Sequence, residues 1–189
     1  MAAAMEAFME LGFAGTSTLE IATRAQVSKR ELYTLFGNKQ AILAACTADR
    51  GQRMRLPPEV PAARTRSELA EVLTTLGARL LVEICDPRVV GVFRLAITEA
   101  QAAPEVAQTL NLTRQSVRNS VREVIAKAVS AGLLAQGDPD KITGEFLSML
   151  WGDLLISLLL RLREAPAPEE AQRRAQHATS VLLQLHPDP

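Results

Sequence analysis

The sequence predicts an all-α protein, and three observations support this fold class. The apolar residues recur with the period of a helix along the whole chain. There is no run of alternating apolar and polar residues of the kind that marks a half-buried strand. Turn signals rich in Gly and Pro divide the chain into about nine helical segments. With 189 residues, 48% of them hydrophobic, the chain is long enough for one domain, or two small ones, with a packed core.

Two short helices are expected near the N-terminus, at 18–25 and from residue 29 onward. Each follows a capping box, in which a Ser side chain accepts from a backbone N–H three residues later and a Glu side chain reaches back. The boxes are Ser17 to Glu20 and Ser28 to Glu31. Two short helices separated by such a brief turn form a helix-turn-helix. The side chains expected to face inward are Ile21, Ala22, Val27, Leu32, Leu35 and Phe36.

The second short helix then presents a polar face made of Lys29, Arg30, Tyr33 and Thr34. Cations and hydroxyls at the start of an exposed helix can contact phosphate oxygens or base edges in a major groove. A merely solvated amphipathic helix has the same pattern, so periodicity alone does not separate the two interpretations. Glu31 is interpreted first as the capping partner of Ser28, and second as an acceptor for a cytosine amino group.

Longer helices are expected in the rest of the chain, at 39–55, 65–85, 88–101, 105–131, 139–163 and 168–185. Asp138 is the expected N-cap of helix 139–163, with Pro139 at its first position. The middle of this helix is apolar on nearly all sides, which is typical of an interface. It predicts a symmetric four-helix seam between two copies of the chain. The partners expected from the last helix are Ala178, Val181, Leu182 and Leu185.

Four residues of the longer helices are candidates for a small-molecule site: Phe93, Arg94, Trp151 and Asp153. Few aromatic side chains among many aliphatic ones favour an internal apolar cavity, and a carboxylate such as Asp153 would orient a ligand in it. Structural roles are the alternative. Asp153 would then pair with an Arg or lie at a solvated rim, Arg94 and Glu99 would likewise form structural pairs, and the two rings would belong to the core.

Several functional classes find no support in the sequence. No nucleophile elbow, phosphate loop or metal-spaced cluster is present. Cys46 and Cys85 are far apart and are expected to be buried thiols in a reducing compartment. The most apolar stretch, 146–160, contains Asp153 and is shorter than the roughly 20 residues that span a bilayer. The start lacks the basic region of a signal peptide. The expectation is a cytoplasmic protein that is no enzyme, has no metal or cofactor, and does not contact a membrane.

A series of motifs matches in register over the first 46 residues. They are Ala3-Ala4-x3-Phe8-x3-Gly12-Phe13, Gly15-Thr-Ser17, Ile21-Ala22, Val27-Ser28-Lys29, Leu32-Tyr33-x2-Phe36 and Lys39-x2-Ile42-Leu43. This part of the chain resembles the tetracycline-repressor (TetR) family. Two later motifs, Val92-Phe93-Arg94-Leu95-x3-Glu99-Ala100 and Pro104-Glu105-Val106-Ala107, are similar to the C-terminal domain of the family's AefR-like branch.

The resemblance implies an all-helical homodimer with two domains. Residues 1–46 would be the helix-turn-helix DNA-binding domain, helix 39–55 the connector, and residues 56–189 the ligand-binding and dimerisation domain. Dimerisation would use helices 139–163 and 168–185. The residues expected to touch DNA are Ser17, Thr18, Ser28, Lys29, Arg30, Tyr33, Thr34 and Lys39.

The function that the resemblance implies is that of a repressor, released from double-stranded operator DNA by a small hydrophobic effector. The alternative is an all-helical small-molecule binding protein without specific DNA binding. Glu31 and a first helix that starts almost at Met1 favour this alternative. Gln26 occupies a turn position that often holds Gly in the family, so a positive φ is expected there.

Overall fold

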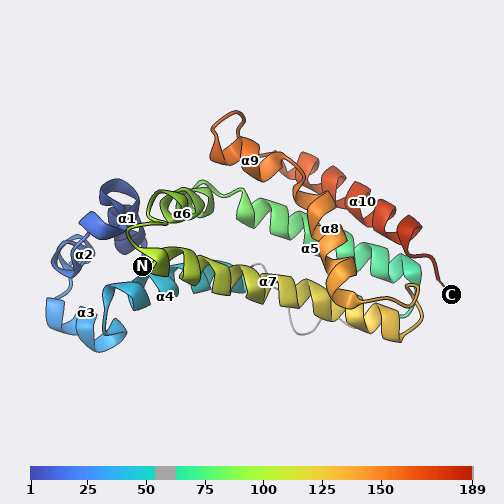
Figure 1. Cartoon of the computed structure of the whole chain (residues 1–189), viewed down its shortest axis with the longest axis horizontal. Helices are drawn as coiled ribbons and strands as arrows, with labels where there is room; N and C mark the ends of the chain where they lie inside the picture. Colours follow the sequence, from blue (N-terminus) through green and yellow to red (C-terminus); the bar gives the residue numbers. More distant parts are fainter. Residues whose placement is uncertain (54–62, 189) are drawn as a thin grey trace. The chain divides into compact units, whose positions relative to one another are not determined.

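The structure is a computed structural model that describes residues 1–53 and 63–188, with side chains described for residues 1–48 and 63–188. Every regular element in these ranges is an α-helix (Figure 1), so the expected fold class is confirmed for them. The helices are α1 (Ala2–Gly15), α2 (Thr18–Ala25), α3 (Lys29–Phe36), α4 (Lys39–Arg53), α5 (Arg66–Ile84), α6 (Pro87–Thr98), α7 (Pro104–Ser130), α8 (Pro139–Trp151), α9 (Leu154–Leu159) and α10 (Pro168–Leu185). The expected end of helix 39–55 and the linker after it lie outside the described residues.

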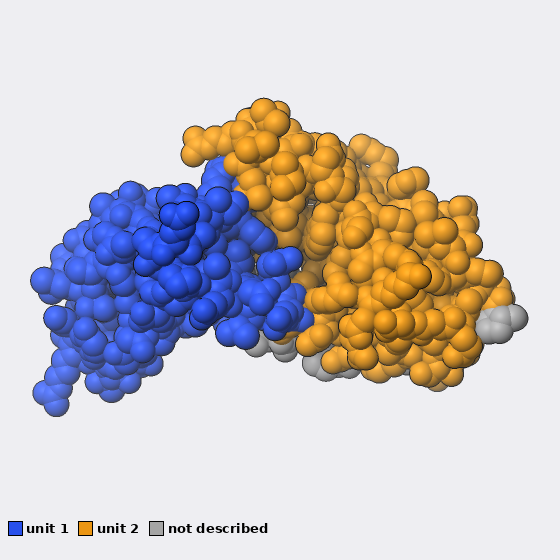
Figure 2. Space-filling view, in the orientation of Figure 1, with its two compact units in different colours: residues 1–52, 87–115 blue, residues 53–86, 116–189 orange. Residues whose placement is uncertain are grey.

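The chain forms two compact units, shown in different colours in Figure 2. Unit 1 contains residues 1–52 and 87–115, and unit 2 contains residues 53–86 and 116–189. Helix α6 and the first part of α7 therefore pack with the N-terminal helices, although the sequence placed them with the second domain. The division of function between residues 1–46 and 56–189 stays a prediction.

The core of unit 1 forms where α1, α4 and α6 bring their apolar faces together. Phe8 and Phe13 of α1 are fully buried, with ring centroids 5.4 Å apart. Leu95 and Ala96 of α6 belong to the same apolar cluster. Burial of each large side chain contributes roughly 1.5–3 kcal/mol to folding. This shared core explains why α6 belongs to unit 1.

Unit 2 is built on α5, which packs along α10 and also contacts α8. The helices approach closely at Gly77, where an added Cβ would lie 3.2 Å from Ala175 and from Leu150. Arg66, at the start of α5, donates to the carbonyls of Leu133 and Leu183, both at 2.6 Å. It thereby fixes the end of α10 and the turn after α7 to the start of α5.

The prediction of one helix over 139–163 is wrong in its second half, because the helix is interrupted at Gly152. The expected start is confirmed, since the Asp138 carboxylate accepts from the Asp140 N–H at 2.9 Å. Gly152 has φ 46° and ψ −130°, which no helix allows. Arg174 of α10 donates to the Leu150 and Trp151 carbonyls at 2.8 and 3.0 Å, and so completes the end of α8.

The residues expected to form a seam between copies differ in their exposure. Ala178 and Leu182 are fully buried within the chain itself, so their expected place at an interface is wrong. They lie on the side of α10 that packs on α5 and α8. Leu185 is 60% exposed. The exposed apolar side chains that follow the interruption of the helix at Gly152 are Ile156, Leu160 and Leu162.

The described ranges contain no helix with the length and hydropathy needed to cross a membrane. In the same part of the chain, no group of three or more His, Cys, Asp or Glu residues could hold a metal ion. Cys46 and Cys85 are both buried thiols, as expected. Burial raises the pKa of the Cys85 thiol to about 11, although nearby Arg163 and Arg174 oppose this shift.

Candidate nucleic-acid interface

The turn between α2 and α3 has a left-handed residue at its centre. Gln26 has φ 55° and ψ 39°, which confirms the expected positive φ. The next N–H, that of Val27, donates to the Ala22 carbonyl at 3.0 Å and closes the end of α2. Ser28 then begins α3, so the brief turn sets the two helices as a helix-turn-helix.

The start of α3 is held by a complete capping box. The Ser28 hydroxyl accepts from the Glu31 N–H at 3.1 Å, and the Glu31 carboxylate accepts from the Ser28 N–H at 2.8 Å. Hydrogen bonds from the side chain and then the backbone of Ser28 hold the pKa of the Glu31 carboxyl below its usual value. Glu31 is therefore the capping partner, as the first interpretation proposed.

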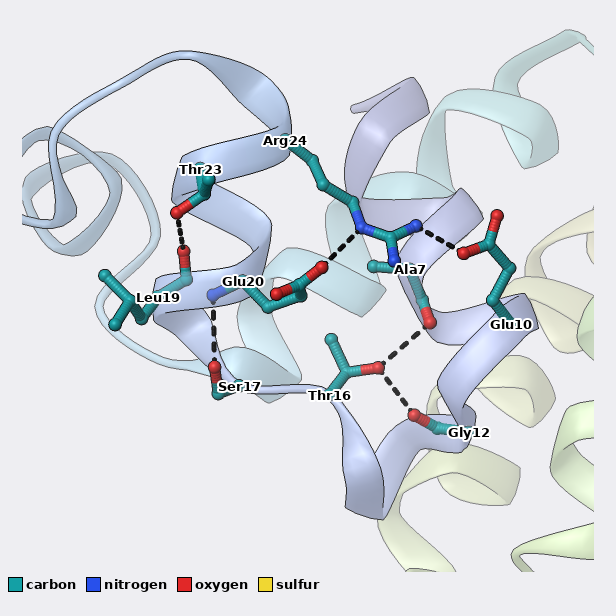
Figure 3. Close-up of polar contacts among 9 residues, drawn as sticks. All are labelled: Ala7, Glu10, Gly12, Thr16, Ser17, Leu19, Glu20, Thr23 and Arg24. Carbon is teal, nitrogen blue, oxygen red and sulfur yellow. Dashed lines mark hydrogen bonds and ion pairs between the residues drawn. The ribbon is translucent and has the colours of Figure 1, made fainter.

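The second expected capping box is only half formed (Figure 3). The Ser17 hydroxyl accepts from the Glu20 N–H at 3.0 Å. The Glu20 carboxylate, however, accepts from Arg24 Nε at 2.7 Å, one helical turn further along α2. Arg24 also donates to the Glu10 carboxylate at 2.6 Å. Glu20 thus binds Arg24 instead of the Ser17 N–H. Because Arg24 also binds Glu10 of α1, it fixes α2 to α1.

The outward face of α3 carries the expected polar side chains. Lys29, Arg30, Tyr33 and Thr34 are all exposed. The Tyr33 hydroxyl lies 3.3 Å from the Thr18 hydroxyl of α2, and Lys29 Nζ lies 5.7 Å from the centre of the Tyr33 ring. Ser17 and Ser28 are exposed too. Cations and hydroxyls from both short helices therefore share one region, where they can meet phosphate oxygens and base edges.

Two apolar residues of this region are more exposed than the sequence predicted. Leu35 is 71% exposed and Val27 is 39% exposed, so the expectation that they face inward is wrong. Leu32 is buried and Phe36 is half-buried. These two lie four residues apart on one stripe, and Leu35 falls beside that stripe. In a helix of eight residues, only one narrow stripe can reach the core.

Lys39 makes contacts within the protein that the sequence did not indicate. Its ammonium group lies 2.7 Å from the Phe13 carbonyl, 3.0 Å from that of Thr16 and 3.5 Å from that of Ala14. It also lies 4.5 Å from the centre of the Phe13 ring. An ammonium group has three donors, and three carbonyls at the end of α1 take them up. These contacts hold the end of α1 in place, and the expected contact of Lys39 with DNA stays a prediction.

The candidate ligand residues are divided between the units. Phe93 and Arg94 lie half-buried on α6 in unit 1. Trp151 lies half-buried at the end of α8 in unit 2. The Asp153 side chain is 86% exposed and lies 3.7 Å from Arg174. The interpretation of Asp153 as an anchor inside a pocket is therefore wrong, and the structural interpretation, an Arg partner at a solvated position, agrees with these contacts.

Glu99, for which the sequence predicted only a structural pairing, has a partner that the sequence did not indicate. Glu99 is buried, and its carboxylate accepts from the Phe13 N–H at 3.0 Å. The two residues are 86 positions apart, so no local pattern connects them. The available signal was the only carboxylate between Asp86 and Glu105, directly after the mainly apolar helix α6.

This fold, in which α3 is capped and presents a polar face, defines a helix-turn-helix protein. Comparisons with known proteins identify its family. Residues 1–46 match the family described as bacterial regulatory proteins, tetR family. Residues 71–185 match the AefR-like transcriptional repressor, C-terminal domain. The chain therefore belongs to the TetR family of DNA-binding transcriptional regulators, and its C-terminal part is of the AefR-like kind.

Proteins of similar sequence and fold agree with this assignment. The uncharacterized HTH-type transcriptional regulator YvkB of Bacillus subtilis (strain 168) is 23% identical, over 96% of this chain and 92% of that protein. A TetR transcriptional regulator from Agrobacterium tumefaciens has a TM-score of 0.81 at 24% identity, over 98% of this chain and 91% of the other. The flavonoid-responsive regulator FrrA has a TM-score of 0.78 at 24% identity, over 100% and 94%. These structures share the fold.

Proposed function

We propose that the protein is a cytoplasmic repressor that binds double-stranded operator DNA as a homodimer and is released by a small hydrophobic effector. The observation that carries the DNA-binding part is the exposed face of α3, where two cations, a phenol and a hydroxyl surround the capped start of the helix. Glu31 no longer favours the alternative of a protein without specific DNA binding, because it is held in the capping box.

The proposed DNA contacts come from both short helices. Lys29, Arg30, Tyr33 and Thr34 of α3 supply contacts to base edges and phosphates, and the hydroxyls of Ser17, Thr18 and Ser28 flank them. The Ser17 and Ser28 hydroxyls each accept a backbone hydrogen bond. Each hydroxyl therefore keeps its own proton, which it can donate to a phosphate oxygen.

Release by an effector is proposed by analogy with the family alone, because the candidate residues of the longer helices are divided between the two units. Phe93, Arg94 and Trp151 remain candidates, and the exposed Asp153 is left out. FrrA, whose fold is similar, is named for its response to a flavonoid. An effector lowers DNA affinity only if it binds one conformation of the dimer better than another. The two heads of a dimer must reach major grooves about 34–36 Å apart, so an effector that changes this spacing lowers DNA affinity.

The Arg30→Ala variant tests the DNA-contact proposal. A double-stranded fragment is first selected by the wild-type protein from a random pool, and its dissociation constant is measured over a range of salt concentrations. We expect affinity to fall steeply with salt, by a slope of about 0.9 per neutralised phosphate. Arg30→Ala should cost about 1–3 kcal/mol and relax the preference at particular base pairs.

Lys127→Ala is the matched control, because Lys127 is an exposed cation on α7 in unit 2. It should leave affinity and base preference unchanged. The proposal is wrong if the wild-type protein selects no double-stranded fragment, or if Arg30→Ala binds as well as Lys127→Ala.

A further inference from the structure

A buried carboxylate joins α6 to the DNA-binding helices of unit 1. Glu99 directly follows α6, is only 8% exposed, and accepts from the backbone N–H of Phe13 at 3.0 Å. A buried carboxylate is costly unless its oxygens are hydrogen-bonded, so this contact depends on an accurate fit. None of the proposed DNA contacts lies on α6. Glu99 nevertheless binds Phe13, which lies four residues before Ser17 at the N-cap of α2.

The backbone of α1 is irregular at the point where this carboxylate enters. Gly12 has φ 74° and ψ 166°, a conformation that interrupts the helix. A Cβ at Gly12 would lie 2.7 Å from Glu99 Oε1. The Thr16 hydroxyl lies 2.6 Å from the Gly12 carbonyl and 3.0 Å from the Ala7 carbonyl (Figure 3). Glycine therefore both permits the irregular turn and leaves room for the carboxylate.

The backbone of Phe13 is also held through its carbonyl, by the first residue of α4. Its carbonyl accepts from Lys39 Nζ at 2.7 Å, and Lys39 is the first residue of α4. Only Gly37 and Asn38 separate Lys39 from the end of α3. Two charged side chains from different helices, Glu99 and Lys39, thus fix one residue of α1 through its N–H and its carbonyl.

We propose that Glu99 is a positioning residue for DNA binding. By fixing Phe13, it sets the carbonyl to which Lys39 binds, and with it the place of the α3–α4 junction. This inference rests on the proposed function of α3 as the DNA-reading helix. According to this inference, α6 affects DNA affinity through the hydrogen bond between the Phe13 N–H and the Glu99 carboxylate.

Two substitutions of Glu99 separate positioning from general stability. Glu99→Gln keeps an acceptor oxygen of the same reach, and Glu99→Leu has a similar volume without an acceptor. Each variant is compared at a temperature where circular dichroism shows it fully folded. Dissociation constants are measured for the fragment selected by the wild-type protein and for a scrambled fragment.

We expect Glu99→Leu to bind the selected fragment about tenfold more weakly, as the loss of one charge-assisted hydrogen bond would predict. Binding to the scrambled fragment should stay unchanged, because misplaced helices still carry the same charges. Glu99→Gln should retain most of the difference in affinity between the two fragments. If Glu99→Leu does not fold, Glu99→Asp replaces it with the same expectation, because its shorter side chain withdraws the oxygen from Phe13.

Gly91→Ala on α6 is the matched control. An added Cβ there would meet only the flexible end of Met9, which is 41% exposed and can move aside without touching Phe13. It should leave both the melting temperature and the discrimination between fragments close to those of the wild type. The inference is overturned if folded Glu99→Leu discriminates as the wild type does, or if Gly91→Ala loses discrimination equally.

A second measurement keeps the inference separate from the proposed function. If the wild-type protein selects no fragment, the function of α3 is wrong, and amide hydrogen exchange of α3 then decides on Glu99. We expect Glu99→Leu to exchange faster than wild type in α3 (Lys29–Phe36), and Gly91→Ala not to. Unchanged exchange of α3 in Glu99→Leu would overturn the positioning role.

Discussion

A single residue, Gln26, determines the geometry of the turn between α2 and α3. Its left-handed conformation lets its own N–H and that of Val27 reach back to carbonyls of α2. For a residue with a Cβ, this conformation costs roughly 1–2 kcal/mol. The helix-turn-helix forms nevertheless, because the turn is flanked by the Ser28 capping box and the buried pair Ile21 and Ala22.

We therefore predict that Gln26→Gly stabilises the protein. Glycine adopts the left-handed conformation without steric cost but loses more entropy on folding, so the net gain should be about 0.5–1 kcal/mol. The free energy of unfolding in urea measures this change. Gln26→Ala, which keeps the Cβ, should show no such gain. A glycine variant no more stable than the alanine variant would contradict the prediction.

At the scale of elements, the division between α8 and α9 depends on Gly152. Its φ of 46° turns the chain out of the helix, and Arg174 donates to the last carbonyls of α8. A Cβ at Gly152 would lie 2.7 Å from Arg174 Nη2. Backbone conformation and the arginine cap thus require the same small residue.

We predict that Gly152→Ala lowers the free energy of unfolding by about 1–3 kcal/mol, because it combines a strained φ with displacement of Arg174. Gly144→Ala is the matched control in the interior of α8. An added Cβ there would meet Arg118 at an ordinary distance of 3.7 Å. This variant should raise stability by about 0.5–1 kcal/mol, as alanine does inside helices. Denaturant unfolding of both variants would refute the interpretation if their effects had the same sign.

At the scale of the whole molecule, the proposed homodimer has to use side chains that the protomer leaves exposed. Leu182 is unsuitable as a test because it is fully buried within the chain, so a charge there would disrupt unit 2 itself. Ile156 and Leu160 are 58% and 63% exposed, on α9 and immediately after it. We therefore choose this pair, four residues apart, to test for the dimer surface.

We predict that the wild-type protein sediments as a dimer at micromolar concentration. Replacing Ile156 and Leu160 together by Glu should give folded monomers, because buried charges without partners oppose association. Operator affinity should be lost with the dimer, since each half-site then binds alone. Val82→Glu, at an exposed apolar position on α5, should remain dimeric. A wild-type monomer, or a dimeric double variant, would show that another surface or none is used.

The elements were predictable where the signals are local. Helical periodicity, the Ser28 capping box and the Asp138 cap with Pro139 involve residues within four positions of one another, so the sequence places them next to each other. The exposed face of α3 followed from the same periodicity. Leu35 was misplaced because periodicity gives the direction of a side chain without the width of the stripe that its partners cover.

What the sequence determined by itself is the helical class, the two short helices, the Ser28 and Asp138 caps and the polar face that begins α3. All of these arise from interactions along one helix or turn. The tertiary structure decided which helices share a core and which charged groups meet. Lys39 reaches carbonyls 23 to 26 positions away, and Glu99 meets an N–H 86 positions away. Such pairs depend on how helices pack, because only packing brings distant residues within the 3 Å or so at which a hydrogen bond forms.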